Sequence, residues 1–211
     1  GQETPDATGN HGGDVKDSTY ISMSSAASLV RASVFGGGEM AIVDGNTRIN
    51  ISDGKIGRKE VKPLTDKSDI NAGYVLFGGA TMGNVYGGGK GVLGYTTAGQ
   101  VKGNTNVNIT GGEIYHMVYG GGALGSVGDF KVSKKEGDKY VPSHIPVSGI
   151  PYDWTENTGT ATVTITGGTI GISGRDNGLV FGSSRGDLAK PVEDPASDNK
   201  LVDPHDKVAV S

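Results

Sequence analysis

A strand-and-turn unit recurs three times in this chain, and it constrains the fold more than any other feature. Each copy alternates apolar and polar residues and then ends at an Asp-Gly or Gly-Gly pair. The copies occupy residues 45–57, 103–114 and 159–170. Alternation with a period of two gives a strand one buried and one solvated face, and the glycine supplies the backbone freedom of a sharp corner. The unit therefore predicts strands joined by tight turns.

The apolar residues of the three copies fall at matching positions. We expect one face of each strand to be buried and the Asn, Thr and Arg residues between to face solvent. The predicted buried pairs are Ile49 with Ile51, Val107 with Ile109, and Val163 with Ile165.

A second unit consists of an apolar residue, an aromatic residue and a glycine cluster. Its copies begin at Val34, Leu76, Val85, Val118 and Val180, and the last copy is degraded after its first glycine. Glycine makes up 38 of the 211 residues, against about 7% in an average protein. Interior glycine costs a helix about 1 kcal/mol per site. This density excludes a helical bundle and a doubly wound α/β enzyme.

Short strands, glycine corners and repeated apolar positions predict an all-β chain that forms a β-solenoid with irregular rungs. A single rung cannot bury its apolar face, whereas rungs stacked about 4.8 Å apart close a continuous core. A β-sandwich or a propeller built from the same strands is the competing architecture. We favour the solenoid because four evenly spaced strands per propeller blade are not found.

The repeats divide the chain into three regions. Residues 1–33 are a polar N-terminal segment or cap, 34–185 hold the solenoid repeats, and 186–211 form a linker or cap rich in proline and aspartate. Two stretches, 58–71 and 129–157, lack the repeat and contain proline. We expect both to leave the stack as extruded loops, where binding residues of solenoids often lie.

The combination of the two units resembles the glycine-rich repeat regions of large cell-surface, adhesin-like proteins of Bacteroidetes. It is more distantly similar to the β-helix passengers of autotransporters. The matching residues run from Val34 to Ile172, interrupted by the two insertions. The resemblance implies a solenoid fold and an extracellular or cell-surface location in a bacterium. It implies no catalytic residues, because the shared positions belong to the core and the corners.

Charge and composition exclude several function classes. The formal net charge is -4 and the basic residues are scattered, so a nucleic-acid role has no electrostatic support. No apolar run approaches the length of a membrane-spanning helix. Cysteine is absent, which excludes disulfides and thiolate metal sites. The chain begins at Gly1 without a signal peptide, as expected of a mature or excised fragment.

Motifs for catalysis, cofactors and metals are weak. The segment Gly87–Val92 has a lysine, Lys90, but lacks the hydroxyl residue that follows the lysine of a phosphate-binding loop. The glycine clusters lack the repeating aspartate of calcium-binding rolls. His116 is expected to be an exposed strand histidine, and the aspartates near the N-terminus (Asp6, Asp14 and Asp17) to be solvated. We therefore expect no catalytic residue, no cofactor and no bound metal.

Three aromatic residues of the second insertion, Tyr140, Tyr152 and Trp154, are the candidate partner-binding residues. Aromatic rings with polar tips suit contacts with proteins or sugars; the alternative is that they cover the flank of the solenoid. The predicted function is a non-enzymatic structural or adhesive segment that binds a host or cell-surface protein or glycan. The alternatives are a polysaccharide lyase or glycosidase on a β-helix, and a fibre subunit that associates end to end.

Overall fold

The structure is a computed structural model that describes residues 13–57, 83–92, 97–129, 159–173 and 177–186. It also describes the strand segments 131–136, 139–142, 152–155, 192–193 and 201–202. Within these residues the chain forms strands and turns and no helix. The prediction of an all-β chain is confirmed for this part of the protein.

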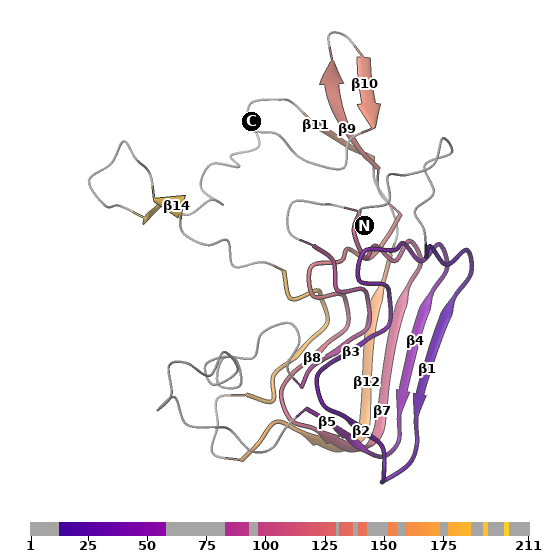
Figure 1. Cartoon of the computed structure of the whole chain (residues 1–211), viewed down its shortest axis with the longest axis vertical. Coiled ribbons are helices and arrows are strands. Elements are labelled where there is room, and N and C mark those ends of the chain that lie inside the picture. Colours follow the sequence, from indigo (N-terminus) through magenta and orange to yellow (C-terminus); the bar gives the residue numbers. More distant parts are fainter. Residues whose placement is uncertain are drawn as a thin grey trace.

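Four strands, which we call the long strands, pair in one parallel sheet in the order of the chain (Figure 1). These strands are β1 (Thr19–Met23), β4 (Thr47–Ile51), β7 (Thr105–Ile114) and β12 (Ala161–Ile170). They pair in a common register that aligns Thr19, Thr47, Thr105 and Ala161. Each alternating motif of the sequence therefore lies directly beside the next one.

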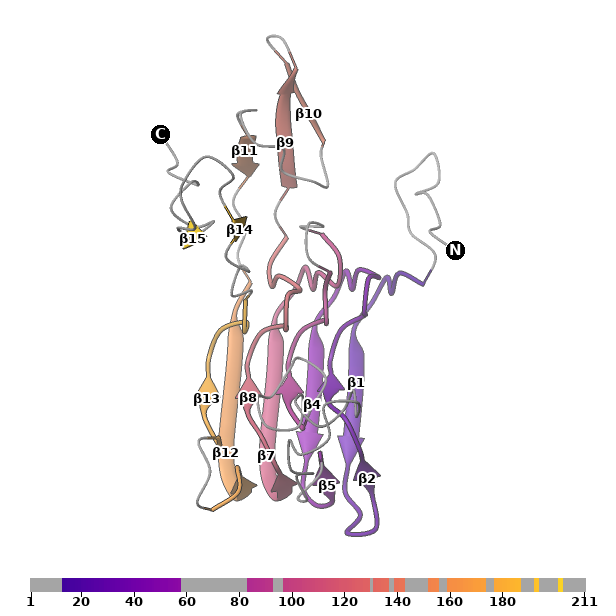
Figure 2. The ribbon, with the colours of Figure 1, turned by 60° about the vertical axis from the view of Figure 1, so that its left-hand side comes forward.

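Two further rows of short strands repeat the same order (Figure 2). One row pairs β2 (Leu29–Val30), β5 (Lys55–Ile56) and the ends of β7 and β12. The other row pairs β3 (Val34–Phe35), β6 (Val85–Tyr86), β8 (Val118–Tyr119) and β13 (Val180–Phe181). Isolated parallel bridges add a fourth row, formed by Val15, Val43, Val101 and Val127.

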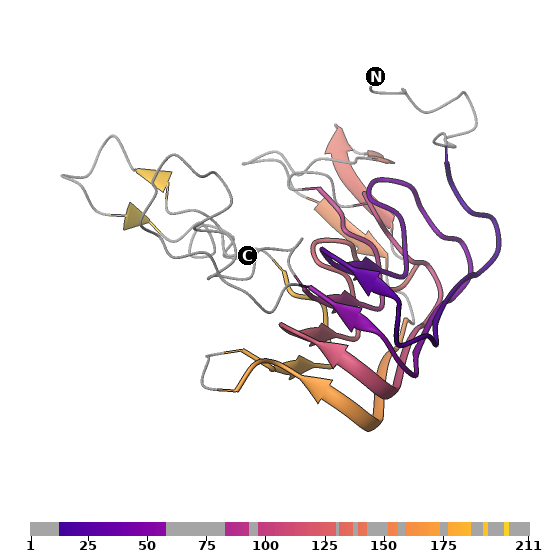
Figure 3. The ribbon, with the colours of Figure 1, turned by 60° about the horizontal axis from the view of Figure 1, so that its bottom comes forward.

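The chain visits these four rows in the same order four times. We call these circuits passes 1 to 4, and they begin at Val15, Val43, Val101 and Val127. Every pairing between neighbouring passes is parallel, and the sheets curl strongly around a common interior (Figure 3). This arrangement is compatible with a β-helix-like fold.

The interior is a set of apolar columns that run across the passes. Ile49, Ile51, Val107 and Ile109 are almost fully buried, as the alternation predicts. Ile165 of pass 4 is 42% exposed instead. It belongs to the same column, but β12 is the last strand of its sheet in the described structure, so nothing packs on its outer side.

The aromatic residues of the second repeat unit form their own column. Phe35, Tyr86, Tyr119 and Phe181 stack ring on ring, with centroids 4.9 Å apart and planes within 6–10° of parallel. This spacing matches the distance between neighbouring strands. Stacking therefore explains why an aromatic residue recurs once per pass; the copy at Leu76 lies outside the described residues.

The glycine that follows each aromatic residue is required by the close approach of the passes. A Cβ on Gly36, Gly87 or Gly120 would meet the carbonyl oxygen of the equivalent glycine in the next pass. No positive φ is involved at these positions. The glycine clusters thus leave room for neighbouring backbones.

An inward threonine crosses the interior and bonds this glycine in three of the passes. The hydroxyl donates to the carbonyl oxygen of Gly36 from Thr19 at 2.6 Å, and to those of Gly87 and Gly120 from Thr47 and Thr105 at 2.5 Å. Pass 4 has Ala161 at this position and no such hydroxyl. The bond joins the long sheet to the aromatic row and satisfies a buried carbonyl.

The parallel pairing extends further towards the N-terminus than the repeat motif. Val15 and β1 belong to pass 1 and lie within residues 1–33, the predicted polar segment or cap. The motif is hard to detect here because Ser and Ala replace the glycine pair after Met23. β1 is the outermost strand of its sheet.

The remaining strands lie outside the four rows. The insertion 129–157 contains β9 (Lys131–Glu136), β10 (Lys139–Pro142) and β11 (Tyr152–Thr155), which form an antiparallel sheet. The segment expected to be a loop thus has regular structure in its described parts. In the tail, β14 (Val192–Glu193) pairs with β15 (Leu201–Val202). The insertion 58–71 lies outside the described residues.

Candidate functional site

The three candidate partner-binding residues belong to the sheet formed by β9, β10 and β11. Tyr152 and Trp154 pair with Lys134 and Val132 of the central strand β9. Tyr140 of β10 pairs with Lys135. Residues two apart on a strand share a face of the sheet. By register, Tyr152 and Trp154 therefore occupy one face and Tyr140 the other.

The insertion leaves and rejoins the stack at one corner. Gly128 closes the valine row by donating its N–H to the carbonyl oxygen of Val101 at 2.8 Å. Gly159 lies so close that a Cβ on it would meet the backbone of Gly128. Figures 1 and 2 show β9 and β10 beyond the N-terminal ends of the long strands. The described strands between the two glycines, β9 to β11, therefore lie outside the stack, which continues from Gly128 to Gly159.

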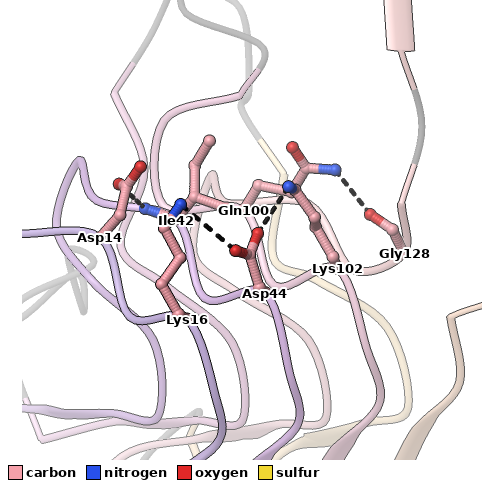
Figure 4. A network of polar contacts seen from close by, with 7 residues as sticks. All are labelled: Asp14, Lys16, Ile42, Asp44, Gln100, Lys102 and Gly128. Atoms are coloured by element: carbon pink, nitrogen blue, oxygen red, sulfur yellow. Dashed lines mark hydrogen bonds and ion pairs between the residues drawn. The ribbon is translucent and has the colours of Figure 1, made fainter. Parts of the chain in front are cut away.

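A buried glutamine fixes this corner. Gln100 is 1% exposed and donates from Nε2 to the carbonyl oxygen of Gly128 at 2.7 Å (Figure 4). A buried amide without such a partner would lose its hydrogen bonds to water and gain none in return, which destabilises the fold. Gln100 therefore orients the point from which the insertion projects.

A ladder of charged side chains follows the valine row on the outside of the stack. Asp44 lies between Lys16 and Lys102, with N–O distances of 3.4 and 2.5 Å (Figure 4). These residues directly follow Val43, Val15 and Val101, so they occupy equivalent positions in passes 1 to 3. Asp14 accepts a hydrogen bond from the backbone N–H of Ile42 at 2.8 Å. It thereby ties pass 1 to pass 2.

The charges of this ladder stabilise each other. The hydrogen bond from Lys102 is the main reason why the pKa of Asp44 lies below its ordinary value, and Lys16 adds to the effect. Exposed ion pairs contribute little to stability on average. These ion pairs instead favour the observed register, because each one joins neighbouring passes. Lys55 with Glu113 at 3.3 Å and Lys90 with Glu39 also join neighbouring passes.

The segment that resembles a phosphate-binding loop has a structural role. The backbone of Gly88 packs against Gly122 of pass 3, where a Cβ would find no room. Lys90 forms its ion pair with Glu39 of pass 1. Gly87–Val92 is therefore part of the contact between passes.

His116 differs from the expected exposed strand histidine. It lies in the bend between β7 and β8 and is partly buried. Its Nδ1 is 2.5 Å from the side-chain oxygen of Asn84, which is itself buried. Burial lowers the pKa of His116 below its ordinary value, and the positive charge of Arg185 adds to the shift. Folding therefore favours the neutral form of the His116 imidazole over the charged form.

The described residues contain no group of three or more His, Asp or Glu side chains that could hold a metal ion. In the same part of the chain, no helix is long and apolar enough to cross a membrane. No protein-family model, curated protein or solved structure matches this chain. Inference about its function therefore depends on the geometry of the chain itself.

Sequence reasoning located the aromatic insertion but missed the residues at its root. Gln100 and the Lys16–Asp44–Lys102 ladder flank or follow single valines, which carry no repeat motif by themselves. Aligning the passes on Val15, Val43, Val101 and Val127 would have placed the three charges in one column.

Proposed function

We propose that the chain is a non-enzymatic β-solenoid segment of a bacterial surface protein. In this proposal the stacked passes form a rigid support, and the β9–β11 sheet contacts a protein or glycan partner. The extracellular location comes from the resemblance of the repeats and stays a prediction.

The observation that carries the proposal is the common register of all four passes. The residues aligned with Thr19 and with Phe35 recur in each pass. The pairing of β12 with β7 is irregular around Gly167 and returns to the same register by Ile170. Apolar columns, stacked rings and glycines without room for a Cβ make up the interior and the contacts between passes. A solenoid accounts for every one of these features, whereas a sandwich or a propeller does not require parallel neighbours.

The β9–β11 sheet supplies the binding part of the proposal. In the described structure its strands pair only with each other, so the stack does not need it to satisfy its own backbone. Tyr152 and Trp154 share one face by register, and aromatic side chains are favoured at contacts with proteins and sugars. The hydrogen bond between Gln100 and Gly128 fixes the point where the insertion leaves the stack, which would give the sheet a defined orientation.

The experiment removes the excursion and measures both roles. Because Gly128 and Gly159 are neighbours, residues 130–157 can be replaced by a short Gly-Ser linker. We expect the far-UV circular dichroism and the melting temperature to change little. Binding to an array of polysaccharides and glycoproteins should be lost, whereas the intact chain binds at least one of the array components.

A matched pair of variants tests the aromatic face. Trp154 is the single tryptophan of the chain, so its fluorescence reports directly on events at β11. Trp154→Ala should abolish or strongly weaken binding, whereas Asp153→Ala, on the opposite face by register, should not. Binding that survives removal of 130–157 contradicts the adhesive role. Cleavage of a polysaccharide by the intact chain would favour the lyase or glycosidase instead.

A further inference from the structure

Pass 4 presents an uncovered edge with the composition of an interior. β12 and β13 are the outermost strands of their sheets in the described structure. Ile165, Val180 and Phe181 are 42%, 44% and 39% exposed, although their equivalents Ile109, Val118 and Tyr119 are buried. An edge strand with apolar side chains is a template for another strand.

Gly182 is a second, independent indication that another pass fits against pass 4. In passes 1 to 3 the equivalent glycines have no room for a Cβ because the next pass stands against them. Gly182 has nothing within 4 Å of the position of a Cβ, and its φ is not positive. Among the described residues, neither space nor backbone conformation requires glycine there, but a further pass stacked on pass 4 would.

Pass 1 offers a complementary edge at the other end of the stack. Its strands β1, β2 and β3 are outermost in the same rows, and the exposed Tyr20 and Leu29 lie on this edge. Ile21, Met23 and Phe35 belong to the columns that end at Val163, Ile165 and Phe181. The two ends of one molecule therefore match each other column by column.

We propose that the uncovered edge of pass 4 binds the pass 1 edge of a second copy of this chain, in the parallel register that joins neighbouring passes within the molecule. Phe181 then stacks on Phe35 of the second copy and continues the aromatic column. Ser183 stands where the other passes have a glycine, so the contact follows the strands to Gly182 and diverges beyond it. A head-to-tail contact of this kind does not close on itself and produces open chains.

The register assigns individual pairs across the contact. Asn108 pairs with Thr164, and Ser22 pairs with Asn50. Adding one more pass therefore places Thr164 opposite Ser22 of the second copy. Neighbouring strands lie about 4.8 Å apart, which is within the Cα separation that a disulfide bridges.

The chain has no cysteine, so engineered thiols report this register cleanly. We expect a mixture of the Thr164→Cys and Ser22→Cys variants of the full chain to form a mixed disulfide under mild oxidation. Thr164→Cys mixed with Tyr20→Cys is the register control. It should cross-link poorly, because the two positions are offset by two residues, about 6.6 Å along the strand. Thr164→Cys alone should give little homodimer.

Sedimentation velocity measures the association itself. The full chain should form a series of oligomers as its concentration rises from micromolar to millimolar. Ile165→Lys should weaken this association at least about tenfold, because a charge enters an apolar contact. Thr164→Lys, on the solvent face of the same strand, should change it less than about twofold. Gly182→Ala should weaken association without unfolding the chain.

A chain that stays monomeric throughout this range overturns the proposal. So does a predominant Thr164–Thr164 cross-link, which would mean that two pass 4 edges pair with each other. The proposal depends on the stacked passes of the proposed function but not on partner binding by β9–β11. An unaltered chain that stays monomeric but still binds the array would therefore reject this contact alone.

Discussion

The contact between passes predicts opposite effects of the same substitution at two equivalent glycines. A Cβ on Gly87 would fall on the carbonyl oxygen of Gly120, whereas a Cβ on Gly182 meets no described residue within 4 Å. Gly87→Ala must therefore push passes 2 and 3 apart or distort the strands between them. Gly182→Ala leaves a single molecule unstrained.

The magnitude follows from the hydrogen bonds at this contact. Gly87 donates to the carbonyl of Tyr119 at 2.9 Å, Gly88 donates to Gly121 at 3.1 Å, and Thr105 donates to Gly120 at 2.5 Å. Each net hydrogen bond contributes about 1 kcal/mol, so losing them costs about 3 kcal/mol. Alanine recovers about 0.4–1 kcal/mol by restricting the unfolded chain. We expect a net loss of about 2–3 kcal/mol.

Urea unfolding followed by far-UV circular dichroism measures both variants. Gly182→Ala, which has only the unfolded-state term, should be neutral or more stable by up to about 1 kcal/mol. The measurement is made at low protein concentration, so that association does not contribute. A loss below about 1 kcal/mol for Gly87→Ala, or an equal loss for both variants, would refute the stacked-pass explanation of the glycine clusters.

Three further substitutions test other parts of the interior. The hydroxyl of Tyr86 is buried and has no hydrogen-bond partner among the described residues, and its column also contains phenylalanine. Tyr86→Phe should therefore be neutral or raise the free energy of unfolding in urea by about 1 kcal/mol. Thr105→Val keeps the shape but leaves the carbonyl of Gly120 unsatisfied; the same measurement should show a loss of about 1–3 kcal/mol. The third concerns pH. His116 has a pKa below its ordinary value of 6.5 in the folded state, so the unfolded chain takes up the proton first as the pH falls. Its contribution to stability is complete above about pH 6.5 and is lost below it. His116→Gln should therefore flatten the fall in unfolding free energy as the pH drops below about 6.5. An unchanged slope would exclude His116 as its cause.

The part of the fold that the sequence predicts is the part set by local alternation. Ile49 and Val107 alternate with polar residues, and this period of two decides which side chains turn inward. The same rule, applied strictly, also turns Thr47 and Thr105 inward, and both are fully buried. The expectation that threonine faces solvent with Asn and Arg is therefore wrong at these two positions. In the structure each hydroxyl has a backbone carbonyl as its partner.

Contacts between passes were harder to predict because they join residues far apart in the chain. Asp44 forms an ion pair with Lys102, which lies 58 residues further along the chain, and neither residue belongs to a recognisable motif. Gln100 is recognisable as a root residue only when Gly128 is known to lie beside it. Such pairs depend on the length of each pass, and insertions make the passes unequal in length.

Burial itself depends on the place of a pass in the stack, which no repeat motif encodes. Ile109 and Ile165 occupy the same position of the same motif, yet the first is fully buried and the second is 42% exposed. Glycine follows the aromatic residue in both passes, although only Gly120 has a neighbour that requires it. Pass 4 thus keeps the composition of an interior pass at Ile165, Phe181 and Gly182. That composition is the one a strand needs when another pass lies against it, and it gives the uncovered edge a physical reason to bind one.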